Sequence, residues 1–340
     1  MTTTRATLPQ HPPNLAQALR QGRDNNLDLI RLTAALCVAV SHAWPLALGP
    51  GTAEPLEDLT GRSLGGWAVL AFFFLSGLLV GRSAATRPAR AFWQARARRL
   101  FPALGLALLV TLALALICGA EGGPGALAAY VLRGLTLVSI AHALPGAWPA
   151  NPIPAIANGP VWSLFHEAAA YTLCFAATRL RLMTRRFGPG LLGLSALALW
   201  AGAESLPPRL ATFAPLWLAF VCGMLGWHFA FRIRLRVDGA AGLALLALLS
   251  GGALPLAILA LGQGLLCLAF RTRPLPLPAD LSYGVYLYAW PVAQTLLAVF
   301  GPLPPPSLAG WTIAACLPFA ALSWWLAERP GATGLRRAAD

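Results

Sequence analysis

The stretch RLTAALCVAVSH, residues 31–42, places a cation and a histidine at the two ends of ten residues that are nearly all apolar. On an ideal α-helix eleven residues advance about three turns with roughly 20° left over, so Arg31 and His42 share one face about 16 Å apart. Burying either side chain in hydrocarbon is costly, so each is a candidate for a function. Taken alone, Arg31 could instead extend its charged group to the membrane surface. Asp28, three residues before Arg31, is placed to pair with its guanidinium group.

The composition of the chain indicates an all-α, polytopic integral membrane protein. Of its 340 residues 57% are hydrophobic and only 11% are charged, which argues against a soluble domain. All 25 basic residues are Arg, and they gather between apolar runs, so the net charge of +13 indicates membrane orientation and no nucleic-acid partner. The six Cys occur singly, without a C-x-x-C pair, and predict buried apolar residues and no metal site.

Ten apolar runs predict the membrane-spanning helices. They cover residues 28–48, 64–81, 100–118, 161–178, 188–203, 211–230, 239–252, 254–270, 281–300 and 308–327. Arg residues concentrate in alternate connecting segments, above all in the predicted loops 82–99 and 179–187. Because Arg-rich loops face the cytoplasm, both termini are predicted to be cytoplasmic.

Two regions leave the number of crossings open. Residues 239–270 are interrupted at SGGALP, and basic segments on both sides require an even number of crossings, so two short helices are predicted there. Residues 126–143 carry Arg133 at their centre and are predicted to form an interfacial or re-entrant helix instead of an eleventh span.

The chain is expected to form one membrane domain, residues 27–329, between two cytoplasmic tails, residues 1–26 and 330–340. The first apolar run is long and lacks an A-x-A cleavage site, so it is predicted to stay as a spanning helix. No repeat or appended soluble domain is evident in the sequence. Any chemistry is therefore expected within the membrane domain.

A histidine and a carboxylate are predicted to lie at the same depth. His42 lies about 21 Å along the first helix, which leaves roughly 9 Å to the outer surface. The fourth helix runs the other way, so His166 and Glu167 also lie roughly 8 to 9 Å below that surface. A carboxylate beside an imidazole stabilises its protonated form, as a general base requires, and His42 with Glu167 is the predicted dyad.

The alternatives to this dyad are a structural histidine and a metal site. A lone His42 could simply hydrogen-bond a neighbouring helix. Adjacent residues of a helix diverge by about 100°, so His166 and Glu167 cannot face one direction. The segment HEAAAY, residues 166–171, lacks the second His of H-E-x-x-H, and no metal is expected.

The segment FWQARARRLFPA, residues 92–103, brings three Arg residues together at the cytoplasmic mouth of the third helix. Guanidinium groups match phosphate oxygens in pairs, so Arg96, Arg98 and Arg99 predict a seat for a polyanion. The alternative is ordinary topology signalling by basic residues. Combined with a base inside the membrane, phosphates point to a coenzyme that carries a group to be moved.

These segments, taken in order, resemble acyltransferase family 3, the bacterial membrane O-acyltransferases of the O-antigen acetylase type. The resemblance covers residues 26–330. It is carried by NLDLIRLTAALCVAVSH with Arg31 and His42, FFFLSGLLVGR (72–82), Arg96-x-x-Arg99, NGPVWSLFHEAAAY (158–171), LSYGVYLYAWPV (281–292) and LAERP (326–330). Many members have His where this chain has Ala289, so this position receives no catalytic role.

The resemblance implies a donor, an acceptor and a location. The donor is acyl-CoA, with acetyl-CoA expected, and the acceptor is a glycan or lipid-linked sugar at the bacterial cytoplasmic (inner) membrane. His42 would act as base and Glu167 would orient it. The residues expected to bind the coenzyme are Arg31, Arg96, Arg98, Arg99 and Asp28, and the candidates for lining a substrate cavity are Trp162, Ser163, Tyr171, Tyr283 and His166.

Two other classes of protein stay open at this point. In a transporter or lipid-linked-sugar flippase the intramembrane His and Glu would form a proton relay, and in a non-catalytic subunit the chain would only bind polyprenyl-linked sugars. The acceptor, the length of the acyl chain and the oligomeric state, with a homodimer left open, are not read from the sequence.

Overall fold

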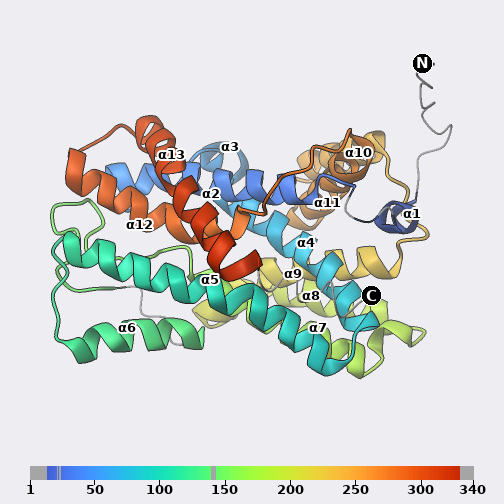
Figure 1. The fold of residues 1–340 in the computed structure, drawn as a ribbon. Helices are drawn as coiled ribbons and strands as arrows, with labels where there is room; N and C mark the ends of the chain where they lie inside the picture. Colours follow the sequence, from blue (N-terminus) through green and yellow to red (C-terminus); the bar gives the residue numbers. More distant parts are fainter. Residues whose placement is uncertain (1–13, 21, 23, 139–142, 330–340) are drawn as a thin grey trace, which may run out of the picture. The chain divides into compact units, whose positions relative to one another are not determined.

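The computed structural model describes residues 14–20, 22, 24–138 and 143–329, and this part of the chain is all-α (Figure 1). The described residues form no β-strand and contain only two isolated β-bridges, Asn14 with Arg234 and Ala143 with Ile156. Each of the ten predicted apolar runs coincides with a helix. These are α2 (Leu27–Leu48), α4 (Leu64–Thr86), α5 (Ala89–Ile117), α7 (Trp162–Arg179), α8 (Gly188–Ala201), α9 (Pro208–His228), α10 (Val237–Leu249), α11 (Leu254–Arg271), α12 (Ser282–Phe300) and α13 (Pro305–Ser323).

Shorter elements complete the described chain. They are α1 (Leu15–Arg20), α3 (Glu57–Thr60), α6 (Pro124–Thr136), the 3-10 turns η1 (Leu182–Thr184) and η2 (Ala203–Ser205), and the π-helical turn η3 (Trp324–Glu328). The 13 residues of α6 span about 20 Å, less than the roughly 30 Å of a hydrocarbon layer. This length is consistent with the prediction for residues 126–143, of which 139–142 lie outside the described residues.

Six helices of the described chain are long and apolar enough to cross a membrane: α2, α4, α5, α9, α11 and the continuous α13–η3 segment. Two shorter apolar helices, α8 and α10, accompany them. The protein is therefore a polytopic all-α membrane protein, as predicted, while the total of ten crossings stays a prediction. The helices α7 and α12 are outside this set, and they carry several of the polar side chains described below.

One predicted connection is wrong. The segment 82–99 was expected to be a loop, but α4 continues to Thr86 and α5 begins at Ala89, so Arg96, Arg98 and Arg99 lie on the first turns of a helix. Arg has a high helix propensity, and it extends the helix beyond the apolar run that marks the membrane-spanning part.

The chain divides into two compact units, and the first combines Met1–Leu27, Phe73–Arg82 and Arg179–Pro276. Its helices α4 and α9 cross at two glycines. A Cβ atom on Gly77 would lie 1.9 Å from the Phe220 carbonyl oxygen, and one on Gly223 would lie 2.0 Å from the Phe74 carbonyl oxygen. Small residues let membrane helices approach this closely, and neither position tolerates a side chain.

The first unit also contains α1, in the segment predicted to be a polar tail. Asn14 and Gln17 form a reciprocal capping box: each side chain accepts a hydrogen bond from the other residue's backbone N–H, at 2.8 and 3.0 Å. The backbone N–H of Leu15 donates to the Ile233 carbonyl at 2.9 Å, and Leu15 is completely buried. Part of this segment is therefore a docked helix.

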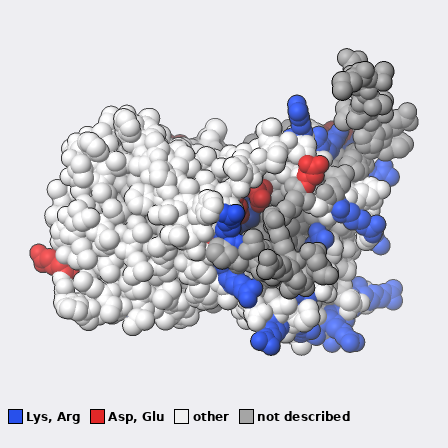
Figure 2. All heavy atoms as spheres, in the orientation of Figure 1, with Lys and Arg blue, Asp and Glu red and all other residues white. Residues whose placement is uncertain are grey.

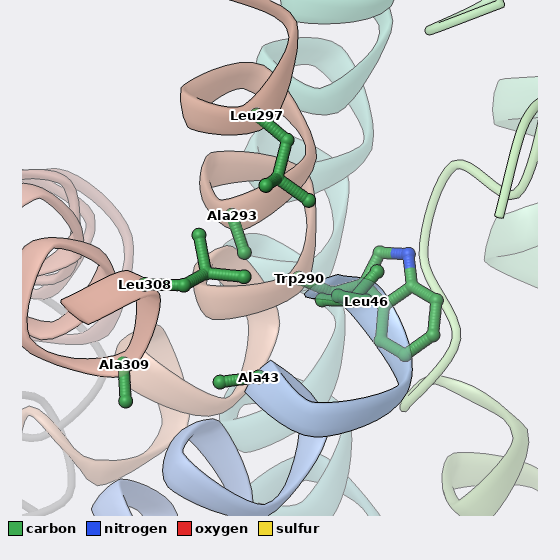
Figure 3. Packing of buried hydrophobic residues seen from close by; sticks show 7 residues of the cluster. All are labelled: Ala43, Leu46, Trp290, Ala293, Leu297, Leu308 and Ala309. Carbon is green, nitrogen blue, oxygen red and sulfur yellow. The ribbon is translucent and has the colours of Figure 1, made fainter. Parts of the chain in front are cut away.

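The second unit combines Asp28–Phe72, Ser83–Thr178 and Leu277–Asp340. An apolar cluster packs the second half of α2 against α12 and α13 (Figure 3), and its members are Ala43, Leu46, Trp290, Ala293, Leu297, Leu308 and Ala309. Figure 2 shows a broad surface nearly bare of charged side chains over α5, α6, α12 and α13. Such a surface is typical of helices that face lipid.

Contacts within the second unit fix the relative directions of its helices. Arg31 of α2 contacts Asp280, just before α12, and His42 contacts Trp290 in the middle of α12. Both helices therefore run in the same direction. In α7 and α5, Tyr171 lies beside Arg96 and the later Phe175 lies beside the earlier Phe92, so this pair is antiparallel.

Candidate functional site

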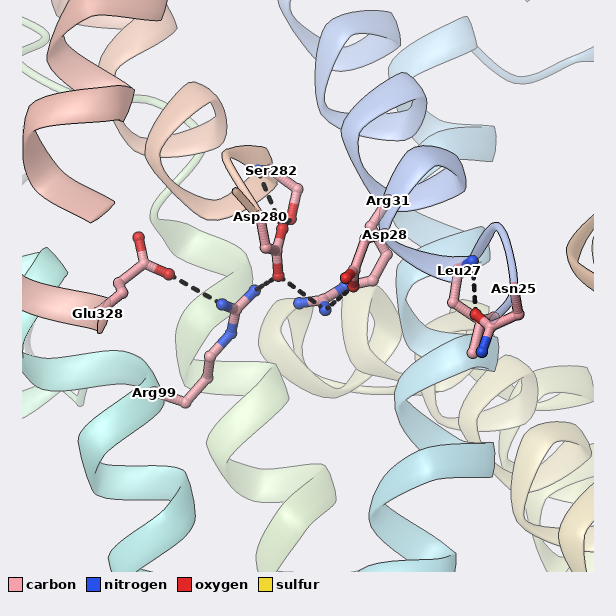
Figure 4. Close-up of polar contacts among 8 residues, drawn as sticks. All are labelled: Asn25, Leu27, Asp28, Arg31, Arg99, Asp280, Ser282 and Glu328. Carbon is pink, nitrogen blue, oxygen red and sulfur yellow. Dashed lines mark hydrogen bonds and ion pairs between the residues drawn. The ribbon is translucent and has the colours of Figure 1, made fainter. Parts of the chain in front are cut away.

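An ionic cluster of four residues lies at the N-terminal end of α2 and α12 (Figure 4). The Asp280 Oδ2 atom lies 3.0 Å from Arg31 Nη1 and 3.2 Å from Arg99 Nη2. The Arg99 Nη1 atom donates to Glu328 Oε2 at 2.9 Å. This ionic cluster (Arg31, Arg99, Asp280 and Glu328) joins α2, α5, η3 and the start of α12.

The ionic cluster is largely shielded from solvent and its formal charges cancel. The side chains of Arg31, Arg99, Asp280 and Glu328 are 23%, 26%, 17% and 5% exposed. Burial alone would raise the pKa of Asp280, but the two guanidinium groups and hydrogen bonds from Ser282 outweigh it, so this pKa lies well below its usual value. Asp280 is therefore ionised and holds both cations.

Two further Arg residues lie on α5 beside the ionic cluster. The guanidinium carbon of Arg96 lies 5.6 Å from the ring centroid of Tyr171, and Arg98 is exposed. The Nε atom of Arg96 is buried and donates no hydrogen bond to a described residue. Unlike Arg31 and Arg99, these two cations form no ion pair with a described carboxylate. They supply the uncompensated positive charge of this end.

His42 lies at the other end of the 31–42 stretch and packs against α12. Its ring centroid lies 5.3 Å from that of Trp290, with the ring planes 79° apart. The indole Nε1 of Trp290 donates to the Ile156 carbonyl at 3.0 Å, which fixes the indole to the segment before α7. A Cβ atom on Gly159 would lie 2.8 Å from the Trp290 ring, so the absence of a side chain there makes room for the indole.

Three polar residues share one face of α7, because they are four residues apart: Ser163, Glu167 and Tyr171. The Tyr171 hydroxyl donates to the Glu167 carboxylate. The Tyr286 hydroxyl donates to the Pro160 carbonyl at 2.7 Å, so its oxygen accepts the proton of Ser163, also at 2.7 Å. These hydrogen bonds connect α7 to α12 between the ionic cluster and Trp290.

The residues of this arrangement lie in a part of the chain that matches a known protein family. A model described as an acyltransferase domain matches residues 24–328, which include every residue of the ionic cluster, His42 and Glu167. The chain belongs to the acyltransferase 3 family. The protein is therefore an acyltransferase, as the sequence predicted.

Two curated relatives align with this acyltransferase over nearly their whole length. Nodulation protein 10 of Rhizobium leguminosarum bv. viciae is 28% identical, over 91% of this chain and 93% of the relative. The O-acetyl transferase of Shigella phage Sf6 is also 28% identical, over 90% of this chain and 96% of the relative. No solved structure matches the chain.

The structure places the predicted dyad of the acyltransferase in separate surroundings. His42 contacts Trp290, whereas Glu167 bonds Tyr171, and no hydrogen bond or ion pair joins His42 to Glu167 in the described chain. The dyad stays a prediction. The predicted pair of Asp28 with Arg31 is present at 3.7 Å, longer than the contact of Arg31 with Asp280.

The remaining predicted site residues have mainly packing contacts. His166 is buried and its Nδ1 lies 3.1 Å from the Trp162 carbonyl, while the two rings meet edge to face. The Tyr283 hydroxyl donates to the Leu100 carbonyl at 3.1 Å, and its ring lies under the Arg99 guanidinium group. Among the described residues no cluster of three or more His, Cys, Asp or Glu side chains could hold a metal ion.

The sequence interpretation missed several polar contacts between α12 and the segment 151–160. The Asn151 amide donates to the Gln294 side-chain oxygen at 2.8 Å, and the Gln294 amide donates to the Ile153 carbonyl at 2.7 Å. The Asn158 amide donates to the Leu287 carbonyl at 2.8 Å. A signal was available, because Gln294 is an amide within an apolar run and so requires partners. These bonds hold the segment over residues 287–294 of α12, the part of the helix that also contacts His42.

Proposed function

We propose that this acyltransferase moves an acyl group, with acetyl as the expected group, from acyl-CoA to a hydroxyl of a glycan or lipid-linked sugar at the bacterial inner membrane. The observation that carries the proposal is the arrangement along α2. Cations gather at its N-terminal end, and a histidine without a hydrogen-bond partner among the described residues lies about 16 Å further on the same face. The phage relative is named an O-acetyl transferase, which supports transfer to oxygen.

In this proposal the Arg-rich end binds the coenzyme. Arg96 and Arg98 have no carboxylate partner in the described chain and carry the net positive charge that phosphates require. Arg31 and Arg99 are neutralised by Asp280 and Glu328, so they contribute directed N–H groups more than net charge. Asp28 lies at the edge of this end, where the pantetheine arm would pass.

At the other end His42 acts as the general base. The imidazole takes the proton of the acceptor hydroxyl while the hydroxyl oxygen attacks the thioester carbonyl. The C–S bond then breaks, and the proton on His42 passes to the departing coenzyme thiolate. The carboxylate of Glu167 would stabilise the protonated imidazole. Because Glu167 is hydrogen-bonded to Tyr171, this role requires its side chain to turn toward α2.

The proposed topology has ten crossings with both termini in the cytoplasm. Relative directions within the second unit support it: α2 and α12, the first and ninth predicted spans, are parallel, while α5 and α7, the third and fourth, are antiparallel. Cysteine introduced at Arg98 should be labelled from the cytoplasm, and cysteine introduced at Glu57 from outside. Labelling of both from one side would contradict this topology.

The proposed function is tested with purified protein in lipid nanodiscs, acetyl-CoA labelled in the acetyl group, and envelope glycans or lipid-linked sugars as acceptors. We expect label in the acceptor and one free coenzyme A for each acetyl group transferred. Proton uptake or sugar translocation in liposomes, without binding of acetyl-CoA, would identify a transporter instead. Binding of sugar without release of coenzyme A from bound donor would identify a binding subunit.

A further inference from the structure

Asp280 has the densest set of polar contacts in the ionic cluster. Its Oδ2 atom receives both guanidinium groups, from Arg31 at 3.0 Å and from Arg99 at 3.2 Å. Its Oδ1 atom accepts the backbone N–H of Ser282 at 3.2 Å and the Ser282 hydroxyl at 2.5 Å. Both oxygens are engaged, so the carboxylate cannot rotate without breaking contacts to α2, α5 or the start of α12.

The position of Asp280 between two cations offsets their mutual repulsion. Two guanidinium groups on separate helices repel each other, and the repulsion grows as the surroundings become less polar. One carboxylate oxygen between Arg31 and Arg99 replaces that repulsion with two attractions. Glu328 balances the second positive charge through Arg99, and its own side chain is almost completely buried. The two carboxylates therefore offset the electrostatic repulsion between the guanidinium groups, and the two cations can lie side by side.

A phosphate group is recognised by N–H groups that converge from two directions. Arg31 uses only Nη1 in its contacts with Asp28 and Asp280, and Arg99 uses Nη1 and Nη2, so each guanidinium group keeps N–H donors that these ion pairs do not occupy. The separation and angle of these donors depend on the carboxylate between them. Net attraction for an anion comes from Arg96 and Arg98, while convergence comes from the ionic cluster.

We infer that Asp280 is a positioning residue, which holds Arg31 and Arg99 side by side so that together they bind a phosphate of the acyl donor. The inference rests on the proposed function, because it takes acyl-CoA as the donor. Asp280 itself touches neither the donor nor the reacting atoms. It acts through two guanidinium groups, and so it affects donors that carry phosphate and spares donors that lack it.

The test compares Asp280→Asn with wild type on two donors, acetyl-CoA and S-acetyl-pantetheine, which lacks phosphates. The amide keeps the shape and one oxygen but loses the charge. We expect KM for acetyl-CoA to rise about tenfold, the factor that corresponds to loss of one charged hydrogen bond. KM for S-acetyl-pantetheine and kcat for both donors should stay within about twofold. Asp280→Glu should restore part of the affinity for acetyl-CoA.

The matched control is Asp238→Asn, which removes another carboxylate that pairs with an arginine, Arg236, on the exposed surface of the first unit. It should leave both donors unaffected. Equal changes in KM for the two donors, or a fall in kcat alone, would show a merely structural role and overturn the inference. A lower KM for acetyl-CoA in Asp280→Asn would also overturn it, since Asp280 would then compete with phosphate.

Binding of coenzyme A, measured by calorimetry in nanodiscs, separates this inference from the proposed function. If wild-type protein transfers no acetyl group, the proposed function fails. The positioning role is then still decided by whether Asp280→Asn weakens coenzyme A and spares pantetheine. If wild-type protein binds neither compound, both proposals fail.

Discussion

Arg31 and His42 lie eleven residues apart on one helix, but Arg31 has charged neighbours and His42 has aromatic and apolar ones. Arg31 meets the carboxylates of Asp280 and Asp28, and Arg99 and Glu328 extend the set. His42 meets the indole of Trp290, with the apolar Ala43 and Leu46 of the core cluster beside it. A neutralised cation stabilises structure, whereas an imidazole without a hydrogen-bond partner among the described residues keeps its nitrogens available for proton transfer.

The largest expected effect tests the histidine end. His42→Ala should lower turnover with acetyl-CoA by about 10²- to 10⁴-fold, because a general base typically contributes that much. Binding of acetyl-CoA should stay unchanged, since the donor is held at the other end. Release of free coenzyme A and calorimetric binding measure the two quantities. The control is His228→Ala, at the end of α9 in the first unit. Turnover of His42→Ala within tenfold of wild type would remove the base assignment.

The next effect tests the charged end. Arg99→Ala leaves Asp280 and Glu328 without their shared cation, and loss of one partner of a buried ion pair costs about 3 to 5 kcal/mol. Thermal unfolding in nanodiscs should show a clearly lower Tm for Arg99→Ala, while His42→Ala should unfold close to wild type. Similar Tm values for the two variants would contradict the claim that the charged end contributes more to stability than the histidine end.

Acidification should weaken the charged end more than the histidine end. The pKa of Asp280 is lowered in the folded chain, so its contribution to stability is present above the unfolded-state pKa of about 3.9 and is lost as the pH falls below it. The Tm of wild type should therefore drop as the pH is lowered below about 4. Asp280→Asn should have a lower Tm at pH 7 and a flatter profile. Parallel profiles would mean that Asp280 does not carry this dependence.

The smallest effect concerns the support of His42. Trp290→Phe keeps an aromatic ring but loses the hydrogen bond to the Ile156 carbonyl, worth about 1 kcal/mol net. We expect kcat to fall about fivefold with KM for acetyl-CoA unchanged. Gly159→Ala should act in the same direction, because its Cβ would push the indole away from its seat. A rise in donor KM in either variant would show that the two ends are not separate in function.

The positions of the helices were predictable, because hydrocarbon selects for long apolar runs and every such run became a helix. The start of α5 was not, since Arg residues that orient a membrane protein also continue a helix, and only the structure shows where the turns begin. The docking of α1 was missed for a different reason. Its capping pair, Asn14 and Gln17, is too short a signal to distinguish from a polar tail.

The residues of the candidate site could be identified from the sequence, but most of the residues that they contact could not. Arg31 was singled out because burying a cation in hydrocarbon is costly, and Arg99 because it belongs to a group of three Arg residues that could bind phosphate. Their shared partner, Asp280, is about 250 positions from Arg31 in the chain. Sequence spacing reveals neighbours within a helix, such as Asp28, and says nothing of neighbours brought by packing. Trp290 was overlooked for the same reason, since nothing in its own helix indicates a histidine on another.

The two contacts between α2 and α12 have a consequence for biogenesis. Arg31 with Asp280 and His42 with Trp290 form two rungs between parallel helices, eleven residues apart on one and ten on the other. During synthesis α2 emerges long before α12, so the later helix must find a partner already in place. Sliding α12 by one turn, about 5.4 Å, would break both rungs at once. The ionic contact and the aromatic contact therefore favour the same alignment of α12 with α2, and a misaligned helix loses the stabilisation of both.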